Sequence, residues 1–345
     1  MRTTLRGSDY LGALILAWAL CSAAGAAQPT RWLARMNHAL TALDYEGTFA
    51  HSQGARVEML RIIHRVEHGV VYERLMSLDG SGREFIRKGS NLTCYLPDKR
   101  VVLVEHMLPK GSLLGGLPLI DARTARFYDI RQVAHMRIDQ HDTRLITVMP
   151  RDQYRYGYRL WIDHQGMPLK IQLWDNRGGG RVIEQIAFAS LKVLAAIPDS
   201  AFEPGIATAG FRWLRNDAPA LAPAGGHMLN WSARWLPPGF QLAMSAPQMM
   251  PGRPGPVDHL VYTDGLASVS VFVERKPLAP SSGRPRIESA RMGASYVFST
   301  LVQGHRVTAV GEVPARTVRS IADSVREKAV VYPLPGGAFA HAPPP

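Results

Sequence analysis

Nucleophilic and titratable residues in this 345-residue chain do not fall into a known catalytic pattern. The sequence has no GxSxG turn of a serine hydrolase and no glycine-rich phosphate or dinucleotide loop. His64 and His68 are four residues apart, a spacing that suits a metal only on a helix, whereas the residues around them predict a strand end and a turn. We therefore expect no enzymatic activity, no cofactor and no metal.

Three arginines, Arg151, Arg155 and Arg159, recur at every fourth position. Guanidinium groups bind phosphate through paired hydrogen bonds, so these side chains are candidates for contact with a lipid headgroup or an acidic peptide. The structural alternative is a solvated, arginine-rich strand edge that discourages aggregation. The formal net charge of +12 agrees with an acidic partner, and equally with a compositional bias towards arginine.

The stretch that follows, YGYRLWIDHQGMPLKIQLWD (156–175), predicts a β-hairpin with two different faces. Side chains alternate along a strand, so one face is aliphatic throughout. A helix could cover that face, or a curved sheet could leave a cavity there for an acyl chain. The candidate residues for lining such a lipid pocket are Leu160, Ile162, Leu169, Ile171 and Leu173.

The opposite face of the hairpin mixes tryptophan with charged residues. We expect Trp161 and Trp174 to lie at a partly exposed rim, together with Arg151, Arg155 and Arg159, where the sheet meets a partner or a headgroup. The alternative is that the two indoles pack under a loop or against a second domain.

Periodicity places these residues in a mainly antiparallel β domain, residues 28–203. Apolar residues at helical spacing predict a helix at 31–43, and alternating runs separated by turns predict strands from 45 to 106 and from 144 to 191. Residues 109–122 suit an apolar loop or a short helix. Without βαβ alternation, the sheet should be built from hairpins.

A second, smaller β domain is expected at residues 227–330, after a Pro/Ala/Gly-rich linker at 204–226. Its last element should be a helix that follows Pro314. Trp235 and Tyr262 are expected in the core, yet with Asp264 they are also candidates for binding an extended peptide at a sheet edge. Residues 331–345 should be a disordered tail.

The N-terminus has the pattern of a cleaved secretory signal peptide. Arg2 and Arg6 precede an apolar run, LGALILAWAL, and small residues follow up to about residue 27. Export argues against a nucleic-acid partner. Cleavage would leave Cys94 as the one cysteine, so no intrachain disulfide is expected, and Cys94 should be a buried apolar residue.

Read in order, several segments resemble the RseB/MucB family of periplasmic regulators of the envelope-stress sigma factor. They are ALDYEGTF (42–49), SLDGSGREFIRKG (77–89), the 156–175 hairpin, WSARWLPPGF (231–240), HLVYTDGLASVSVFVE (259–274) and GHRVTAVGEVPARTVRSIADSV (304–325). The resemblance implies an α+β fold. Its first part is a LolA-like antiparallel β half-barrel with helices in its concave face, and its second is a smaller C-terminal antiparallel β domain with a terminal helix.

The resemblance also implies a function and a location. The protein would act in the periplasm as a negative regulator that binds the periplasmic tail of a membrane-anchored anti-sigma factor of the RseA/MucA type. It would shield that tail from regulatory proteolysis until lipopolysaccharide or another lipid releases it. Self-association is a further implication, although no symmetric patch in the sequence predicts it. The alternative function is a periplasmic lipid or lipoprotein carrier of the LolA type, for which the second domain would be unnecessary.

Overall fold

The computed structural model describes residues 29–106, 113–114, 124–138, 141–215, 230–249, 255–275 and 288–328. The predicted signal peptide, the predicted tail at 331–345 and all of the 109–122 segment except residues 113–114 lie outside these ranges. Among the described residues, no helix is both long and apolar enough to cross a membrane.

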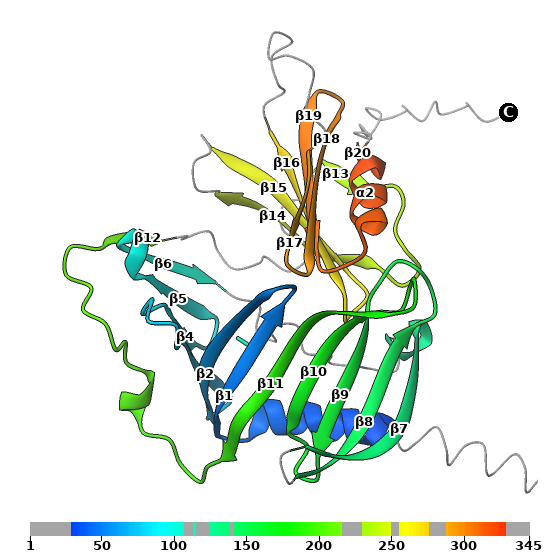
Figure 1. Ribbon diagram of the computed structural model, residues 1–345. Coiled ribbons are helices and arrows are strands. Elements are labelled where there is room, and N and C mark those ends of the chain that lie inside the picture. The colour runs from blue at the N-terminus through cyan, green and yellow to red at the C-terminus, as the bar shows by residue number, and fades with distance from the viewer. Residues whose placement is uncertain are drawn as a thin grey trace, which may run out of the picture.

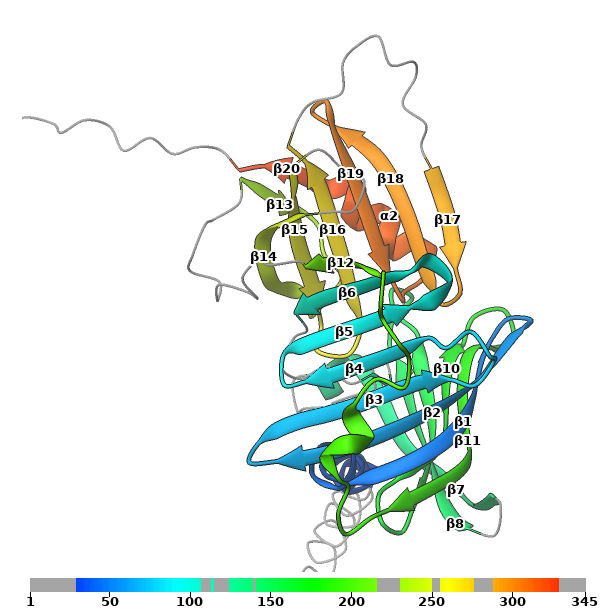
Figure 2. The ribbon, with the colours of Figure 1, turned by 90° about the vertical axis from the view of Figure 1, so that its left-hand side faces the viewer.

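Twelve strands form one curved sheet in the larger domain, in the order β12-β6-β5-β4-β3-β2-β1-β11-β10-β9-β8-β7 (Figures 1 and 2). All neighbours are antiparallel except β12 and β6, which are parallel. The strands are β1 (Tyr45–Gln53), β2 (Arg56–Glu67), β3 (Val70–Ser77), β4 (Glu84–Lys88), β5 (Asn91–Leu96), β6 (Val101–His106), β7 (Tyr128–Ile138), β8 (His141–Pro150), β9 (Gly157–Asp163), β10 (Pro168–Asp175), β11 (Arg181–Val193) and β12 (Arg212–Arg215). Short 3-10 turns occupy Pro97–Lys99, Thr124–Phe127 and Asp199–Phe202.

An N-terminal helix, residues 29–42, crosses one face of this sheet and closes the half-barrel core (Figure 1). Its apolar stripe, including Leu33, Met36 and Leu40, is buried against residues of β1, β2 and β8 to β11. The helix forms where predicted because its apolar residues recur every three or four positions and face a sheet that supplies the matching apolar surface.

The β9–β10 turn fixes how closely the hairpin approaches this helix. Asp163 Oδ1 accepts hydrogen bonds from the backbone N–H groups of Gln165 (2.9 Å) and Met167 (2.8 Å), which shapes the turn. Gly166 has a φ of 95°, and a Cβ there would lie 2.8 Å from the carbonyl oxygen of Arg35. The turn therefore requires glycine for its conformation and for its contact with the helix.

The smaller domain contains a six-stranded sheet in the order β14-β15-β16-β19-β18-β17 and a two-stranded pair, β13-β20. Its strands are β13 (Trp231–Ala233), β14 (Gln241–Met249), β15 (Pro256–Thr263), β16 (Ser268–Glu274), β17 (Glu288–Met292), β18 (Ser295–Val302), β19 (His305–Gly311) and β20 (Val325–Glu327). Helix α2 (Ala315–Ser324) follows Pro314, as predicted, and buries Val318, Ile321 and Ala322 in the core of this domain.

The predicted fold class is confirmed, with two corrections to its elements. Residues 212–215, expected in the linker, form β12 and extend the sheet in parallel beside β6. Strand β7 was not expected, because the apolar residues of YDIRQVAHMRI are interrupted by Asp129, Arg131 and Arg137 and do not alternate regularly. It forms as an edge strand, where only one side needs a partner. The buried position predicted for Cys94 is also confirmed.

Replacing Met36 by alanine should lower the free energy of unfolding by about 2–5 kcal/mol, because a fully buried side chain would leave a cavity between helix and sheet. The matched control is Met292→Ala, since Met292 is 68% exposed and should change stability by less than about 0.5 kcal/mol. Urea denaturation of both variants measures the difference. Equal losses would show that the helix does not close the core.

Candidate functional site

The two domains meet around one carboxylate, Asp264, in the turn between β15 and β16. Its Oδ1 atom accepts hydrogen bonds from the backbone N–H groups of Leu266 (2.8 Å) and Ala267 (2.7 Å), so it shapes its own turn. Its Oδ2 atom accepts a hydrogen bond from the Tyr128 hydroxyl (3.0 Å) and pairs with Arg155 Nη1, both in the larger domain. One side chain thus joins a local turn to the domain interface.

Arg155 is surrounded by partners from both domains. It bonds both carboxylate oxygens of Asp152, with Nη2–Oδ2 at 2.8 Å and Nε–Oδ1 at 3.1 Å. Its Nη2 also donates to the carbonyl oxygen of Pro238 (2.6 Å) in the smaller domain. The rings of Phe127, Tyr128 and Phe240 lie 5.1–5.5 Å from its guanidinium carbon. We call Asp264, Arg155, Asp152 and Tyr128 the Asp264 cluster.

The structure corrects the predicted placement of Arg155 and Asp264. The side chains of both have no exposed surface, whereas a headgroup or peptide contact was expected to lie at an accessible rim or edge. Burial, and secondarily the Asp264 charge, raises the pKa of Tyr128 well above its ordinary value, so this hydroxyl remains protonated and donates its hydrogen bond. Charged groups this deeply buried are maintained because each has its partners.

Apolar contacts surround the Asp264 cluster. Leu266, at the tip of the β15–β16 turn, packs against the core of the half-barrel. Trp235 is half-buried with its ring 5.2 Å from that of Tyr154, and the Thr317 hydroxyl of α2 donates to the Tyr154 carbonyl oxygen at 2.7 Å. Tyr262 is buried, and its hydroxyl accepts a hydrogen bond from the Ala233 N–H (2.7 Å). Trp235 therefore lies at the domain interface and Tyr262 inside the smaller domain, so neither forms part of an exposed sheet edge.

All five lipid-pocket candidates are buried, as expected if a helix or another element covers the aliphatic face of the hairpin. Leu160, Ile162 and Ile171 belong to the core under the N-terminal helix. Leu173 packs instead with Tyr156, Ile183 and Ala294, the last from the turn of the smaller domain between β17 and β18. Leu169 is 7% exposed. The predicted common face is thus divided between the helix and the second domain. That these residues line a lipid pocket stays a prediction.

The two tryptophans of the hairpin each face a cation on the neighbouring strand. The guanidinium carbon of Arg159 on β9 lies 3.4 Å from the centroid of the Trp174 ring on β10. Lys170 Nζ on β10 lies 4.9 Å from the Trp161 ring on β9, and Trp161 Nε1 donates to Met136 Sδ at 3.3 Å. Trp174 is half-buried, but Trp161 is only 7% exposed, so its expected exposure was wrong. Cation–π pairing explains the mixture of indole and charge.

His51 on β1 forms an ion pair with Glu184 on the neighbouring β11. The distance from Nε2 to Oε1 is 2.6 Å, and Gln53 Nε2 donates to the other oxygen of Glu184 at 3.2 Å. The hydrogen bond with Glu184 raises the pKa of His51 above its ordinary 6.5, against a lowering by burial, and the charges of Glu184, Glu58 and Glu312 raise it further. The folded protein therefore favours the protonated imidazole.

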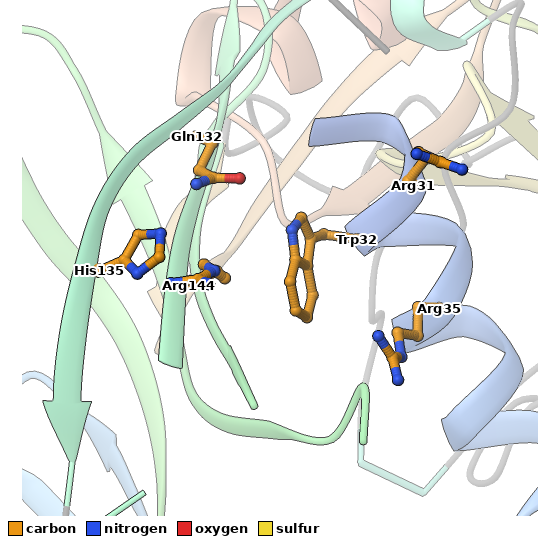
Figure 3. A pocket seen from close by; sticks show the side chains of 6 residues that line it. All are labelled: Arg31, Trp32, Arg35, Gln132, His135 and Arg144. Atoms are coloured by element: carbon orange, nitrogen blue, oxygen red, sulfur yellow. The ribbon is translucent and has the colours of Figure 1, made fainter. Parts of the chain in front are cut away.

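A pocket of about 490 Å³ lies at the β7 end of the large sheet, between the start of the N-terminal helix and strands β7 and β8, of which β7 is the edge strand (Figure 3). We call it the arginine pocket. Its lining residues are Arg31, Trp32, Arg35, Gln132, His135 and Arg144. Sequence reasoning missed it because β7 was not predicted. The available signal was Arg31 and Arg35, four residues apart on the polar side of the predicted helix.

Comparisons with known proteins match both domains. Residues 28–206 match the model of the MucB/RseB N-terminal domain, and residues 226–326 match that of the MucB/RseB C-terminal domain. The chain belongs to the MucB/RseB family.

Family relatives are similar over most of their length. The sigma factor AlgU regulatory protein MucB of Pseudomonas aeruginosa is 32% identical over 88% of this chain and 92% of its own. The sigma-E factor regulatory protein RseB of Salmonella typhimurium is 30% identical, and the match covers 86% of this chain and 90% of that protein. A solved MucA/MucB complex of P. aeruginosa aligns with a TM-score of 0.68 at 30% identity, covering 88% of this chain and 99% of that chain. A structure of MucB aligns at 0.59 and 30% identity, covering 88% and 98%.

Replacing Arg155 by methionine in this MucB/RseB family member should cost about 3–5 kcal/mol of stability, because Asp264 would be left buried without its cationic partner. Arg137→Met is the control, since Arg137 is exposed near the end of β7 farthest from Tyr128 and should cost less than about 0.5 kcal/mol. Urea denaturation and the radius of gyration from X-ray scattering measure stability and domain separation. The Asp264 cluster has no structural role if both variants behave alike.

The contribution of His51 to stability should depend on pH. Its pKa is raised in the folded state, so its stabilisation is complete below the unfolded pKa of about 6.5 and is lost as pH rises through the higher folded value. The stability difference between wild type and His51→Gln should therefore be larger near pH 6 than near pH 9. His38→Gln, at an exposed helix position, is the control. If the stability difference between wild type and His51→Gln did not change with pH, the raised pKa of His51 would be contradicted.

Proposed function

We propose that this protein is a periplasmic negative regulator of an envelope-stress sigma factor. It binds the periplasmic segment of a membrane-anchored anti-sigma factor and shields it from regulatory proteolysis, and a lipid or lipopolysaccharide signal releases it. The observation that carries this proposal is the match over both domains to MucB, which in solved structures is in complex with MucA.

The docked arrangement of the two domains supports a binding role. An unstructured segment loses conformational entropy on binding, and a surface that is already rigid adds no ordering cost of its own. The Asp264 cluster and the partly buried Leu266 hold the domains in one arrangement. The chain aligns better with the two MucA-bound structures, at TM-scores of 0.68 and 0.65, than with the MucB structure at 0.59.

Candidate contacts for the segment or for a lipid headgroup remain those of the hairpin that are accessible. Arg151 is exposed, and Arg159 and Trp174 are half-buried on the outer face of the sheet. A guanidinium stacked on an indole still offers its N–H groups to a carboxylate or phosphate. Trp161 and Arg155 are buried and are therefore no longer candidates for this contact. A carrier function is less well supported, because the helix fills the aliphatic face and the second domain is docked against the first.

The direct test is capture of the purified periplasmic segment of the anti-sigma factor from the same organism. Wild-type protein should bind it and slow its cleavage by the regulatory protease. Arg155→Met should bind several-fold to a hundredfold more weakly, in line with a coupling of about 1–3 kcal/mol between domain arrangement and binding. Arg137→Gln, which removes an exposed charge from β7, should bind like wild type.

Two further outcomes decide between the functions. Addition of lipopolysaccharide micelles should release the captured segment from the wild-type protein. If the segment is not captured in lipid-free buffer, the regulator proposal is wrong. Extraction of a lipidated protein from membrane vesicles would then support the carrier.

A further inference from the structure

We infer that docking of the two domains is controlled by pH, through a charge cluster formed by His51, Glu184 and Glu312. We call these three residues the His51 cluster. His51 and Glu184 belong to strands of the half-barrel, and Glu312 follows β19 in the smaller domain. The effect on docking is a property of the free protein, and its consequence for capture of a partner rests on the proposed function.

The β17–β18 turn of the smaller domain packs on strands β1 and β11 of the half-barrel (Figures 1 and 2). A Cβ at Gly293 in this turn would overlap the side chain of Gln53 on β1. That side chain donates a hydrogen bond to Glu184 Oε2 at 3.2 Å. Ala294, the next residue of the turn, is fully buried and packs with Ile183 on β11. The His51 cluster therefore lies at the domain interface, and it shares no residue with the Asp264 cluster.

Carboxylates from both domains meet at this place. His51 Nε2 lies 2.6 Å from Glu184 Oε1, which is the one ion pair of Glu184 within the described residues. Glu312 forms no ion pair with any residue in the described ranges, yet its charge and that of His51 act on each other across the interface. The Tyr158 hydroxyl on β9 is near the same carboxylates, since burial and then the charges of Glu312, Glu184 and Asp264 raise its pKa well above the ordinary value.

The other charged groups around the His51 cluster already have partners. Glu58 on β2 pairs with Arg56 and, at 3.4 Å, with Arg83. Arg291 on β17 donates from Nε to the carbonyl oxygen of Gly293 in its own turn at 2.9 Å. The imidazole of the cluster is therefore the group whose charge decides whether its two carboxylates are balanced.

Protonation of His51 favours docking. In separated domains Glu184 would still pair with His51, so docking adds the carboxylate of Glu312. A protonated imidazole attracts that carboxylate, whereas a neutral imidazole leaves Glu184 and Glu312 to repel each other in a partly desolvated interface.

The two shifted groups act in the same direction. The hydrogen bond with Glu184 raises the pKa of His51 above 6.5, so the contribution of His51 is complete below about pH 6.5 and is lost as pH rises through the folded value. Desolvation by the surrounding protein, and then the charge of Glu184, raise the pKa of Glu312, although part of this residue is exposed and the charge of His51 opposes the rise. Ionised Glu312 is thus disfavoured in the interface, so docking should weaken as pH rises.

The test is hydrogen exchange, read by mass spectrometry, at the β17–β18 turn of the full mature chain between pH 6 and pH 9, after correction for the intrinsic pH dependence of exchange. Protection of this turn in the wild-type protein should fall about two- to fivefold over this range, the effect expected of one partly exposed charge pair. In Glu312→Gln protection should not change with pH, because the carboxylate that repels Glu184 is absent. In His51→Gln protection at pH 6 should already be as low as in wild type at pH 9.

The matched control is Glu288→Gln, which removes an exposed carboxylate from β17 outside the His51 cluster and should keep the pH dependence of wild type. The inference is overturned if protection in the wild-type protein does not change with pH. It is also overturned if Glu312→Gln remains as dependent on pH as wild type, or if Glu288→Gln removes the dependence equally well.

Capture of the anti-sigma segment at the same two pH values separates this inference from the proposed function. Wild type should capture the segment several-fold more weakly at pH 9 than at pH 6, and Glu312→Gln should lose less affinity over that range. Capture with a turn that does not respond to pH would reject the His51 cluster alone. A responding turn without capture at either pH would reject the regulator role alone.

Discussion

The pairing of Arg155 with Asp264 is the interaction on which the two-domain structure depends. Removing two charges from water costs several kcal/mol per ion, and the cost is offset only when every donor and acceptor has a partner. Here those partners come from both domains: Asp152 and Tyr128 from the half-barrel, and Asp264 and the Pro238 carbonyl from the smaller domain. Separating the domains would remove partners on each side, so the cluster favours one docked arrangement.

That arrangement also explains why side chains of the opening hairpin have different environments. Tyr156 and Leu173 lie beneath the turn at Ala294, Leu160 and Ile162 lie under the helix, and Arg159 and Trp174 stay at the outer surface. A ligand entering the core beside Leu266 would disturb the same interface that the Asp264 cluster holds.

Local pattern predicted much of the structure. The helix stripe from Leu33 to Leu40, the alternation in 156–175 and the helix after Pro314 each have a period set by the backbone, so they were placed correctly. Alternation also placed Trp161 on the face of Lys170.

Alternation could not show that Arg155 is buried, because periodicity along one segment does not show which distant segment packs against it. Asp264 lies more than a hundred residues away. The arginine pocket was missed for the same reason. Strand β12 was missed because it has only four residues, too few to show an alternating apolar pattern.

The most direct test of the central claim is hydrogen exchange at the backbone amides of Leu266 and Ala267, which donate to Asp264 at the domain interface. We expect slow exchange at both amides in the free protein and slower exchange when the anti-sigma segment is bound, because binding uses the docked arrangement. Faster exchange at these two amides on binding would show that the domains must separate to hold the segment, and would contradict the account.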